Sequence, residues 1–445
     1  MSIVPSTAPL VHTHWRRPAR KKRAVPGLLL AVWGALIINT YSFSAQSIAV
    51  PIPTAVGKLI TQGSLVLALL LVLALNPRGL IRPNLVLLLL TILGVLAFMV
   101  SIHNQFAVGS TYRALRLIVF IIVLWLLTPW WGRTDMLILR CHRRVLWLLL
   151  GTVGLGAAVA PGLAFSFGGR LAGVLWPIPA TQVAHLAAVL FGTSVVLWMC
   201  RIIPGRNAAV TVVISGAALG ATHTRTAIAG TLIGLAVATT SLFLGHVRAR
   251  RLSAFWMVAT VVAASFFATG MTTWAMRGQT TREASQLTGR TEVWSDILAA
   301  DRPRVEDLFG SGLSNQGFNG LPIDSAWLGV FVDQGVVGVV ILATMLLVLL
   351  IMAATHERGP QRAVALFLVV YCMVASFTET GLGAATMYSL DLVVAAALLA
   401  PSTSRTAMDV KAELRGPLGD AGSRAHNFGR SALGRRSGVE ARSER

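Results

Sequence analysis

Long apolar runs, separated by short segments that carry charges, proline or glycine, follow one another along most of the chain. Their lengths approach the roughly 20 apolar residues that a helix needs to cross the hydrocarbon core of a bilayer. The pattern therefore predicts an all-α fold, a polytopic transmembrane helix bundle of about twelve spans. The predicted spans are residues 26–45, 59–75, 83–101, 113–131, 145–165, 180–200, 208–222, 226–246, 254–274, 326–354, 363–379 and 382–400.

Three segments depart from this pattern and divide the chain into parts. Residues 1–25 end in a basic cluster, and no convincing cleavage site follows, so they are interpreted as a cytoplasmic N-terminus before an uncleaved first helix. Residues 275–325 are rich in charges and glycine and predict a long outer loop that contains short helices. Residues 401–445 are rich in Ser, Gly and Arg and predict a disordered cytoplasmic tail after a transmembrane domain of residues 26–400.

The distribution of Lys and Arg predicts the orientation. Every short loop that would be cytoplasmic carries at least two of these residues, as the positive-inside rule requires, so both termini are placed in the cytoplasm. Ten of the 38 Lys and Arg residues fall on the outer side. They are Lys58, Arg113, Arg116, Arg170, Arg225 and five residues within 275–325.

Composition and charge change this picture little. Only 12% of the residues are charged, against about 25% in a soluble domain. A net charge of +21 would indicate a nucleic-acid partner for a soluble protein, but the cytoplasmic loops account for it here. We therefore expect membrane lipids and no nucleic acid as partners. The three cysteines lack the spacing of a metal or redox motif, so no metal and no cofactor are predicted.

The outer arginines are the candidate functional residues. Basic residues favour the cytoplasmic side, so each arginine on the outer side needs an anionic ligand or an acidic partner. Some of them occur in local patterns on the predicted outer side. Arg170 lies in GGRLAGVLWPIP at 168–179, Arg225 in THTRTAIAG at 222–230 and Arg290 in TGRTEVWSDIL at 288–298, and a Gly-rich stretch at 308–340 is the fourth pattern. The third pattern predicts a short amphipathic helix on the membrane surface, ended by Asp301-Arg302-Pro303, whose apolar face holds Val293, Trp294, Ile297 and Leu298.

The fourth pattern places two carboxylates in and before a predicted helix. Asp324 lies at its outer mouth, and Asp333 follows about 13 Å deeper along the helix axis. Gly335 and Gly338 then allow close helix packing. Asp324 is the candidate general base, although Asp is also a favoured N-cap. Asp333 is assigned a supporting role, paired with an outer arginine.

In this order, the four patterns resemble the O-antigen ligase and polymerase family of bacterial membrane proteins. In the first pattern, Arg170, Leu171, Gly173 and Pro177 resemble an early motif of the family. In the second pattern, Thr224-Arg225-Thr226-Ala227 resembles the turn motif of the family. The third is similar in Gly289-Arg290 with Trp294, and the Gly-x-Gly of the family looks like Gly310 and Gly312. The last motif is similar in Asp324-Ser325, Trp327-Leu328, Asp333, Gly335 and Gly338. One departure is that Asp324 stands where the ligases have a catalytic histidine.

The resemblance implies a metal-independent glycosyl transfer at the outer face of the cytoplasmic membrane of a bacterium. The implied donor is a polyprenyl-diphosphate-linked glycan and the implied acceptor is a glycan or lipid hydroxyl, with other polysaccharide-assembly proteins as partners. Arg170, Arg225 and Arg290, with Arg113 and Arg116, would bind the diphosphate. A transporter or flippase for an anionic or lipid-linked glycan is the alternative, and a non-catalytic scaffold is a third reading.

Several of these residues have simpler interpretations. Arg170, Arg225 and Arg290 could pair with Glu283, Glu292 or Asp301. Arg113 and Arg116 could extend to the lipid head groups. His223 is the rival to Asp324 as base, whereas His103 and His185, also near the outer side, are interpreted as polar loop or helix residues.

Overall fold

The computed structural model describes residues 26–41, 43, 49, 51–103, 107–166, 168–243, 290–313, 317–318 and 321–401. The basic N-terminus, the predicted span 254–274, the first part of the outer loop and the tail after residue 401 lie outside these residues. What was predicted for them stays a prediction.

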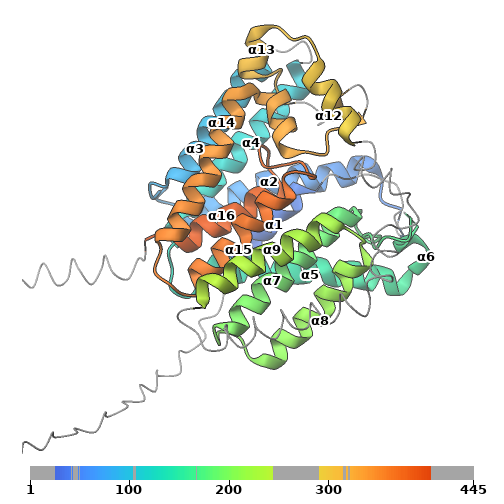
Figure 1. Ribbon diagram of the computed structural model, residues 1–445, viewed down its shortest axis with the longest axis vertical. Coiled ribbons are helices and arrows are strands. Elements are labelled where there is room, and N and C mark those ends of the chain that lie inside the picture. Colours follow the sequence, from blue (N-terminus) through green and yellow to red (C-terminus); the bar gives the residue numbers. More distant parts are fainter. Residues whose placement is uncertain are drawn as a thin grey trace, which may run out of the picture.

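The described chain is a bundle of helices (Figure 1). Its β structure is limited to a short hairpin of β1 (Gly317–Phe318) and β2 (Leu321–Pro322) and one isolated bridge between Gly173 and Ile178. The helices are α1 (Gly27–Thr40), α2 (Thr54–Leu75), α3 (Leu85–Ile102), α4 (Ala107–Leu127), η1 (Thr128–Trp130), α5 (Leu137–Val159), α6 (Pro161–Ala164), α7 (Ala180–Met199), α8 (Gly205–Ala221), α9 (Arg225–Leu242), α12 (Arg290–Ala299), α13 (Arg304–Phe309), α14 (Ala326–Thr355), α15 (Pro360–Ala375) and α16 (Met387–Leu399).

Six helices in the described part of the chain are long and apolar enough to cross a membrane, namely α2, α3, α4 with η1, α7, α9 and α14. The helices α1, α15 and α16 are apolar but shorter. A mostly helical bundle with helices of membrane-spanning length and composition is thus confirmed, whereas twelve spans and their orientation stay predictions.

Helix α5 begins eight residues earlier than the predicted span at 145. The prediction stopped at Arg140, Arg143 and Arg144, but arginine is a good helix former and these side chains continue the helix. Arg143 finds a partner inside the bundle, where its Nη2 donates to Ser194 Oγ at 2.8 Å.

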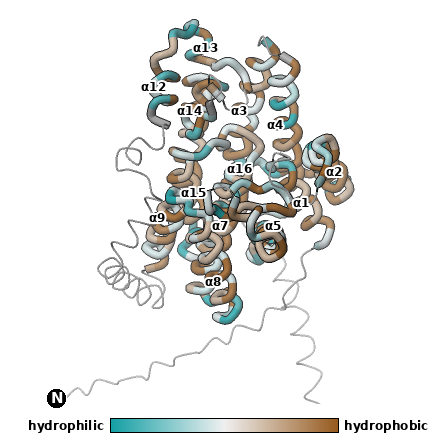
Figure 2. Tube along the Cα trace, turned by 90° about the vertical axis from the view of Figure 1, so that its right-hand side faces the viewer, coloured by the Kyte–Doolittle hydropathy of each residue, from teal (hydrophilic) through white to brown (hydrophobic). Residues whose placement is uncertain are grey.

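Hydrophobic residues run along the helices (Figure 2), and many of their large side chains are exposed on the outside of the bundle. Large side chains such as Leu59 (71% exposed), Leu148 and Val213 face away from the core. In water, such a surface would drive aggregation, but lipid tails are as apolar as these residues. The surface composition therefore fits a bilayer.

Hydrogen bonds sort the connecting segments into two groups. At one end of the bundle, which we call the motif end, they link segments around residues 41–53, 101–113, 168–179, 221–226, 310–326 and 376–386, through Ala49–Val174, Ser101–Leu313, Leu171–Ala221, Ala326–Ser376 and Thr226–Thr378. At the opposite end, the pairs are Arg82–Thr128, Asn76–Leu126, Gly132–Ala397 and Arg133–Gln361. This grouping agrees with the predicted alternation of outer and cytoplasmic segments, and which end faces outward stays a prediction.

That orientation can be measured with engineered cysteines after replacement of Cys141, Cys200 and Cys372. Val305 is 68% exposed on α13 at the motif end, and Arg358 is exposed in the turn after α14 at the opposite end. We expect a membrane-impermeant maleimide to label Val305→Cys in intact cells and Arg358→Cys only after permeabilisation. The opposite pattern would invert the assigned topology.

Candidate functional site

The site is organised by an interruption in α14 at Gly335. Its φ of 66° and ψ of −168° belong to a region of backbone space that is almost restricted to glycine. In an unbroken helix the carbonyls of residues 332 and 333 would accept from residues 336 and 337. Here they accept instead from the backbone N–H groups of Ser311 and Gly312, both at 2.9 Å.

A second glycine permits this contact. Gly310 has φ 79° and ψ −178°, the same unusual conformation as Gly335. A Cβ atom on Gly310 would overlap the backbone of Asp333 and Gln334, and one on Gly335 would overlap the carbonyl of Leu308. The two glycines therefore let the 310–313 segment lie directly against α14.

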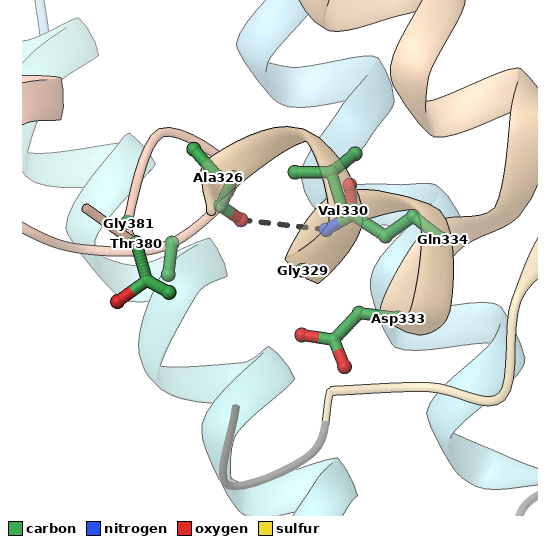
Figure 3. Close-up of a pocket in the computed structure, with 9 residues that line it drawn as sticks. Ala326, Gly329, Val330, Asp333, Gln334, Thr380 and Gly381 are labelled. Atoms are coloured by element: carbon green, nitrogen blue, oxygen red, sulfur yellow. Dashed lines mark hydrogen bonds between the residues drawn. The ribbon is translucent and has the colours of Figure 1, made fainter. Parts of the chain in front are cut away.

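Asp333 lies two residues before the interruption and lines a pocket (Figure 3). The figure shows its carboxylate extending from α14 toward the segment of Thr380 and Gly381. Asp333 is only 6% exposed. The pocket has an empty volume of about 250 Å³, part of it open to solvent, and is lined by Ala326, Gly329, Val330, Asp333, Gln334, Thr380, Gly381, Gly383 and Ala384.

Gln334 contributes a second polar group to this pocket. Its side chain is fully buried, and its Nε2 donates to the carbonyl of Gly383 at 3.3 Å. Its Oε1 has no hydrogen-bond partner among the described residues. A carboxylate and an amide oxygen therefore offer acceptors to a ligand that donates hydrogen bonds, such as a hydroxyl.

Arg113 and Arg116 have different partners. Arg113 donates from Nη1 to the carbonyl of Leu313 at 3.3 Å and so ties α4 to the 310–313 segment. Arg116 donates from Nε to Asn39 Oδ1 at 2.8 Å and from Nη2 to the Asn39 carbonyl. Arg116 therefore ties α4 to the end of α1, which supports neither the predicted diphosphate role nor the head-group interpretation.

Arg170 joins the first and second sequence patterns. Its Nε donates to the carbonyl of Thr222 at 2.9 Å, and its Nη2 donates to Thr224 Oγ1 at 3.0 Å. These acceptors lie in the tight turn between α8 and α9, where His223 has a left-handed φ of 50°. Arg225 is the first residue of α9. The predicted tight turn between these helices is confirmed as residues 222–224, with His223 in it and Arg225 directly after it.

The turn is connected to the pocket through the segment 376–386. Thr378 donates to Thr226 Oγ1 at 2.7 Å, and Trp327 Nε1 donates to Ser376 Oγ at 2.9 Å. The sequence predicted only residues 380–381 between two spans, but α15 ends at Ala375 and α16 begins at Met387. The Ser, Thr and Gly residues of the segment favour non-helical backbone and were the missed signal.

The structure describes part of the third sequence pattern, residues 290–298. Helix α12 begins at Arg290 and ends at Ala299, and Val293 and Ile297 pack against Ile323 and Val332. Leu298 is 69% exposed, and Val293 and Ile297, four residues apart, form the contact with α14. That the apolar face of α12 lies on the membrane surface stays a prediction. The Arg290 side chain and Gly289 lie outside the described part of the chain.

The carboxylate and histidine candidates lie in different parts of the bundle. Asp324 is half-buried beside the start of α14, whose N-cap position is occupied by Ser325. His103 is exposed at the end of α3. His185 is a buried residue of α7, five residues after its start at the motif end, and its Nε2 lies 2.7 Å from Asp391. The prediction of a polar helix residue near that end is confirmed, and its partner Asp391 was not predicted. No group of His, Cys, Asp and Glu in the described residues could hold a metal ion.

Comparison with models of known families finds no match, and no curated protein matches the sequence significantly. The functional interpretation therefore depends on the motifs and on their arrangement.

The interruption of α14 can be tested with glycine substitutions. Gly335→Ala should lower the stability by about 1–3 kcal/mol from backbone strain, with a further cost for the overlap at Leu308. Gly63→Ala in α2 is the matched control, because a Cβ there meets no atom within 4 Å. Thermal unfolding of both variants in detergent gives the comparison. Equal melting temperatures would contradict the assigned role of Gly335.

Proposed function

We propose that the protein catalyses glycosyl transfer at the outer face of the cytoplasmic membrane of a bacterium. The donor is a polyprenyl-diphosphate-linked oligosaccharide, and the acceptor is a hydroxyl of a glycan or lipid. The proposal is supported chiefly by one observation. Arg170 binds the turn that Arg225 directly follows, and the Thr226–Thr378 hydrogen bond links the start of α9 to the segment lining the Asp333 pocket.

The arginines suit the donor. A diphosphate presents several anionic oxygens, which the planar guanidinium fork can bind in pairs. The same diphosphate is the leaving group, so cations held beside it stabilise charge that develops in the transition state. Arg170 and Arg225 are half-buried, where solvent screens such interactions less than on an open surface.

The acceptor step needs a group that orients a hydroxyl and takes its proton. The acceptor oxygen bonds to the anomeric carbon as the bond from that carbon to the diphosphate oxygen breaks. The hydroxyl proton passes to a base of the protein and from there to water. Asp324 is our candidate base and His223 its rival, while Asp333 and Gln334 would hold the hydroxyl in the pocket.

Glycan analysis of a deletion strain tests the class of reaction. Loss of polymer with single repeat units retained indicates a polymerase, whereas polymer stranded on its lipid carrier indicates a ligase. A normal distribution of surface glycan would contradict both.

A transporter or flippase for an anionic or lipid-linked glycan remains the second candidate. One observation favours it. The buried contacts of His142 and His185 with Asp391 place ionisable side chains inside the bundle, where transporters often carry functional groups. In the deletion strain, a transporter would leave the lipid-linked glycan on the cytoplasmic leaflet.

Lysine substitution tests the arginine role. Arg170→Lys, Arg225→Lys and Arg290→Lys keep the charge but remove the fork, so we expect each to reduce glycan formation at least tenfold, about 1.4 kcal/mol. Arg206→Lys, exposed at the opposite end of the bundle, is the control. Full activity in all three variants would leave only generic charge as their role.

Arg170 also holds the turn, so its variant needs a second control. Thr224→Val removes the acceptor of the Arg170 Nη2 bond and leaves the guanidinium in place. If Arg170 acts on the diphosphate, Thr224→Val should retain more activity than Arg170→Lys at equal protein levels. Equal losses would assign Arg170 to the turn alone.

The base assignment is tested by neutral carboxylate analogues. Asp324→Asn keeps the size and polarity but cannot accept a proton, so we expect a loss of about 10²- to 10⁴-fold in rate. Asp333→Asn can still orient a hydroxyl and should lose less. Asp296→Asn, exposed on α12, is the control. Wild-type activity in Asp324→Asn would transfer the role to His223, to be tested with His223→Gln.

A further inference from the structure

Three helices contribute ionisable side chains to one contact inside the bundle. His142 of α5 and His185 of α7 face the two oxygens of Asp391 on α16. The Nε2 atoms lie 2.8 Å from Oδ1 and 2.7 Å from Oδ2, respectively. The three side chains are at most 2% exposed. None of them lines the pocket of Asp333.

The hydrogen on His142 can be assigned from its neighbour. Trp33 Nε1 lies 3.1 Å from His142 Nδ1, and an indole nitrogen can only donate. His142 Nδ1 therefore accepts and carries no hydrogen. The hydrogen of the neutral imidazole is then on Nε2, where it faces Asp391. His142 supplies a donor to the carboxylate but no positive charge.

Among the residues that the structure describes, His185 is the remaining group that can balance the charge of Asp391. Its Nδ1 has no hydrogen-bond partner among the described residues, so no donor prevents protonation there. The ring meets Tyr388 in a T-shaped contact at 4.2 Å between centroids and lies 5.4 Å from Tyr371. An aromatic face stabilises a nearby cation.

In the described part of the chain, the other titratable groups that face Asp391 from the surrounding elements carry no positive charge. They are Tyr41 after α1, Tyr371 and Cys372 of α15, and Tyr388 of α16. A lone carboxylate in an apolar interior is strongly disfavoured. The cluster is therefore neutral as a whole only when it holds one proton in addition to the hydrogen on each Nε2.

We propose that His142, Asp391 and His185 form a proton-binding site inside the helix bundle, in which His185 is the imidazolium and Asp391 its carboxylate partner. The geometry is not that of a metal centre, because each Nε2 faces a different oxygen and not a common point. The proposal does not depend on glycosyl transfer, since it concerns residues outside the candidate site.

The cluster lies close enough to the motif end for proton binding to affect the segments there. His185 lies five residues after the start of α7 and Asp391 four residues after the start of α16. At about 1.5 Å per residue, both are only 6–8 Å from the segments that carry Arg170 and Thr380. Loss of the proton would weaken the link between α7 and α16, and so the alignment of those segments.

The test uses the full-length protein in lipid bilayers. At neutral pH, ¹⁵N-histidine magnetic resonance of the wild type should show one imidazolium whose nitrogen-bound hydrogens are protected from exchange with D₂O. Isotope-edited infrared spectra should show no protonated carboxyl from Asp391. Absence of a protected imidazolium in the wild type would overturn the proposal without any variant.

Matched histidine variants separate proton binding from a purely structural contact. His185→Gln removes the cation, so Asp391 should take up the proton and a new protonated-carboxyl band should appear. His142→Gln removes only a neutral donor and should produce no such band. Equal spectra for the two variants would overturn the assignment to His185, as would a wild-type carboxyl band that disappears in Asp391→Asn.

Discussion

The motif end depends on how backbone groups freed by the interruption of α14 are satisfied. A peptide group without a partner is costly in an apolar interior, so a helix is seldom broken there unless another segment replaces its hydrogen bonds. Ser311 and Gly312 supply those bonds, and they can do so because Gly310 and Gly335 lack side chains. The same contact brings Leu313 to Arg113 and keeps Asp333 at the pocket.

The rest of the motif end is joined by a small number of polar contacts between otherwise apolar helices. Arg170 holds the turn before α9, and Thr378 connects that turn to the non-helical segment between α15 and α16. This segment replaces what would otherwise be two further helical turns with backbone that can line a pocket. Irregular backbone of this kind is tolerated in membrane proteins where protein or a water-filled cavity surrounds it.

The buried contacts of Asp391 set a different constraint on the same bundle. A charge inside an apolar core must be balanced by an opposite charge. The number of protons on His142 and His185 decides whether the negative charge of Asp391 is balanced. Helix α1 enters this balance through Trp33, which fixes the tautomer of His142. The buried cluster draws on α1, α5, α7 and α16, whereas the contacts at the motif end come from α4, α9, α14 and the connecting segments.

The sequence by itself determined the class of the protein and the positions of most helices, because apolar length and charge bias act locally along the chain. It also placed a short turn correctly between the helices that precede and follow His223, with Arg225 directly after that turn. It could not show that Arg170 would meet Thr222, that Arg116 would bind Asn39, or that residues 376–386 would leave the helical conformation. Nor does anything in the order of residues connect Asp391 with His142 and His185. Those pairings join residues tens to hundreds of positions apart, and only the packing of the helices decides which polar groups meet where water cannot satisfy them.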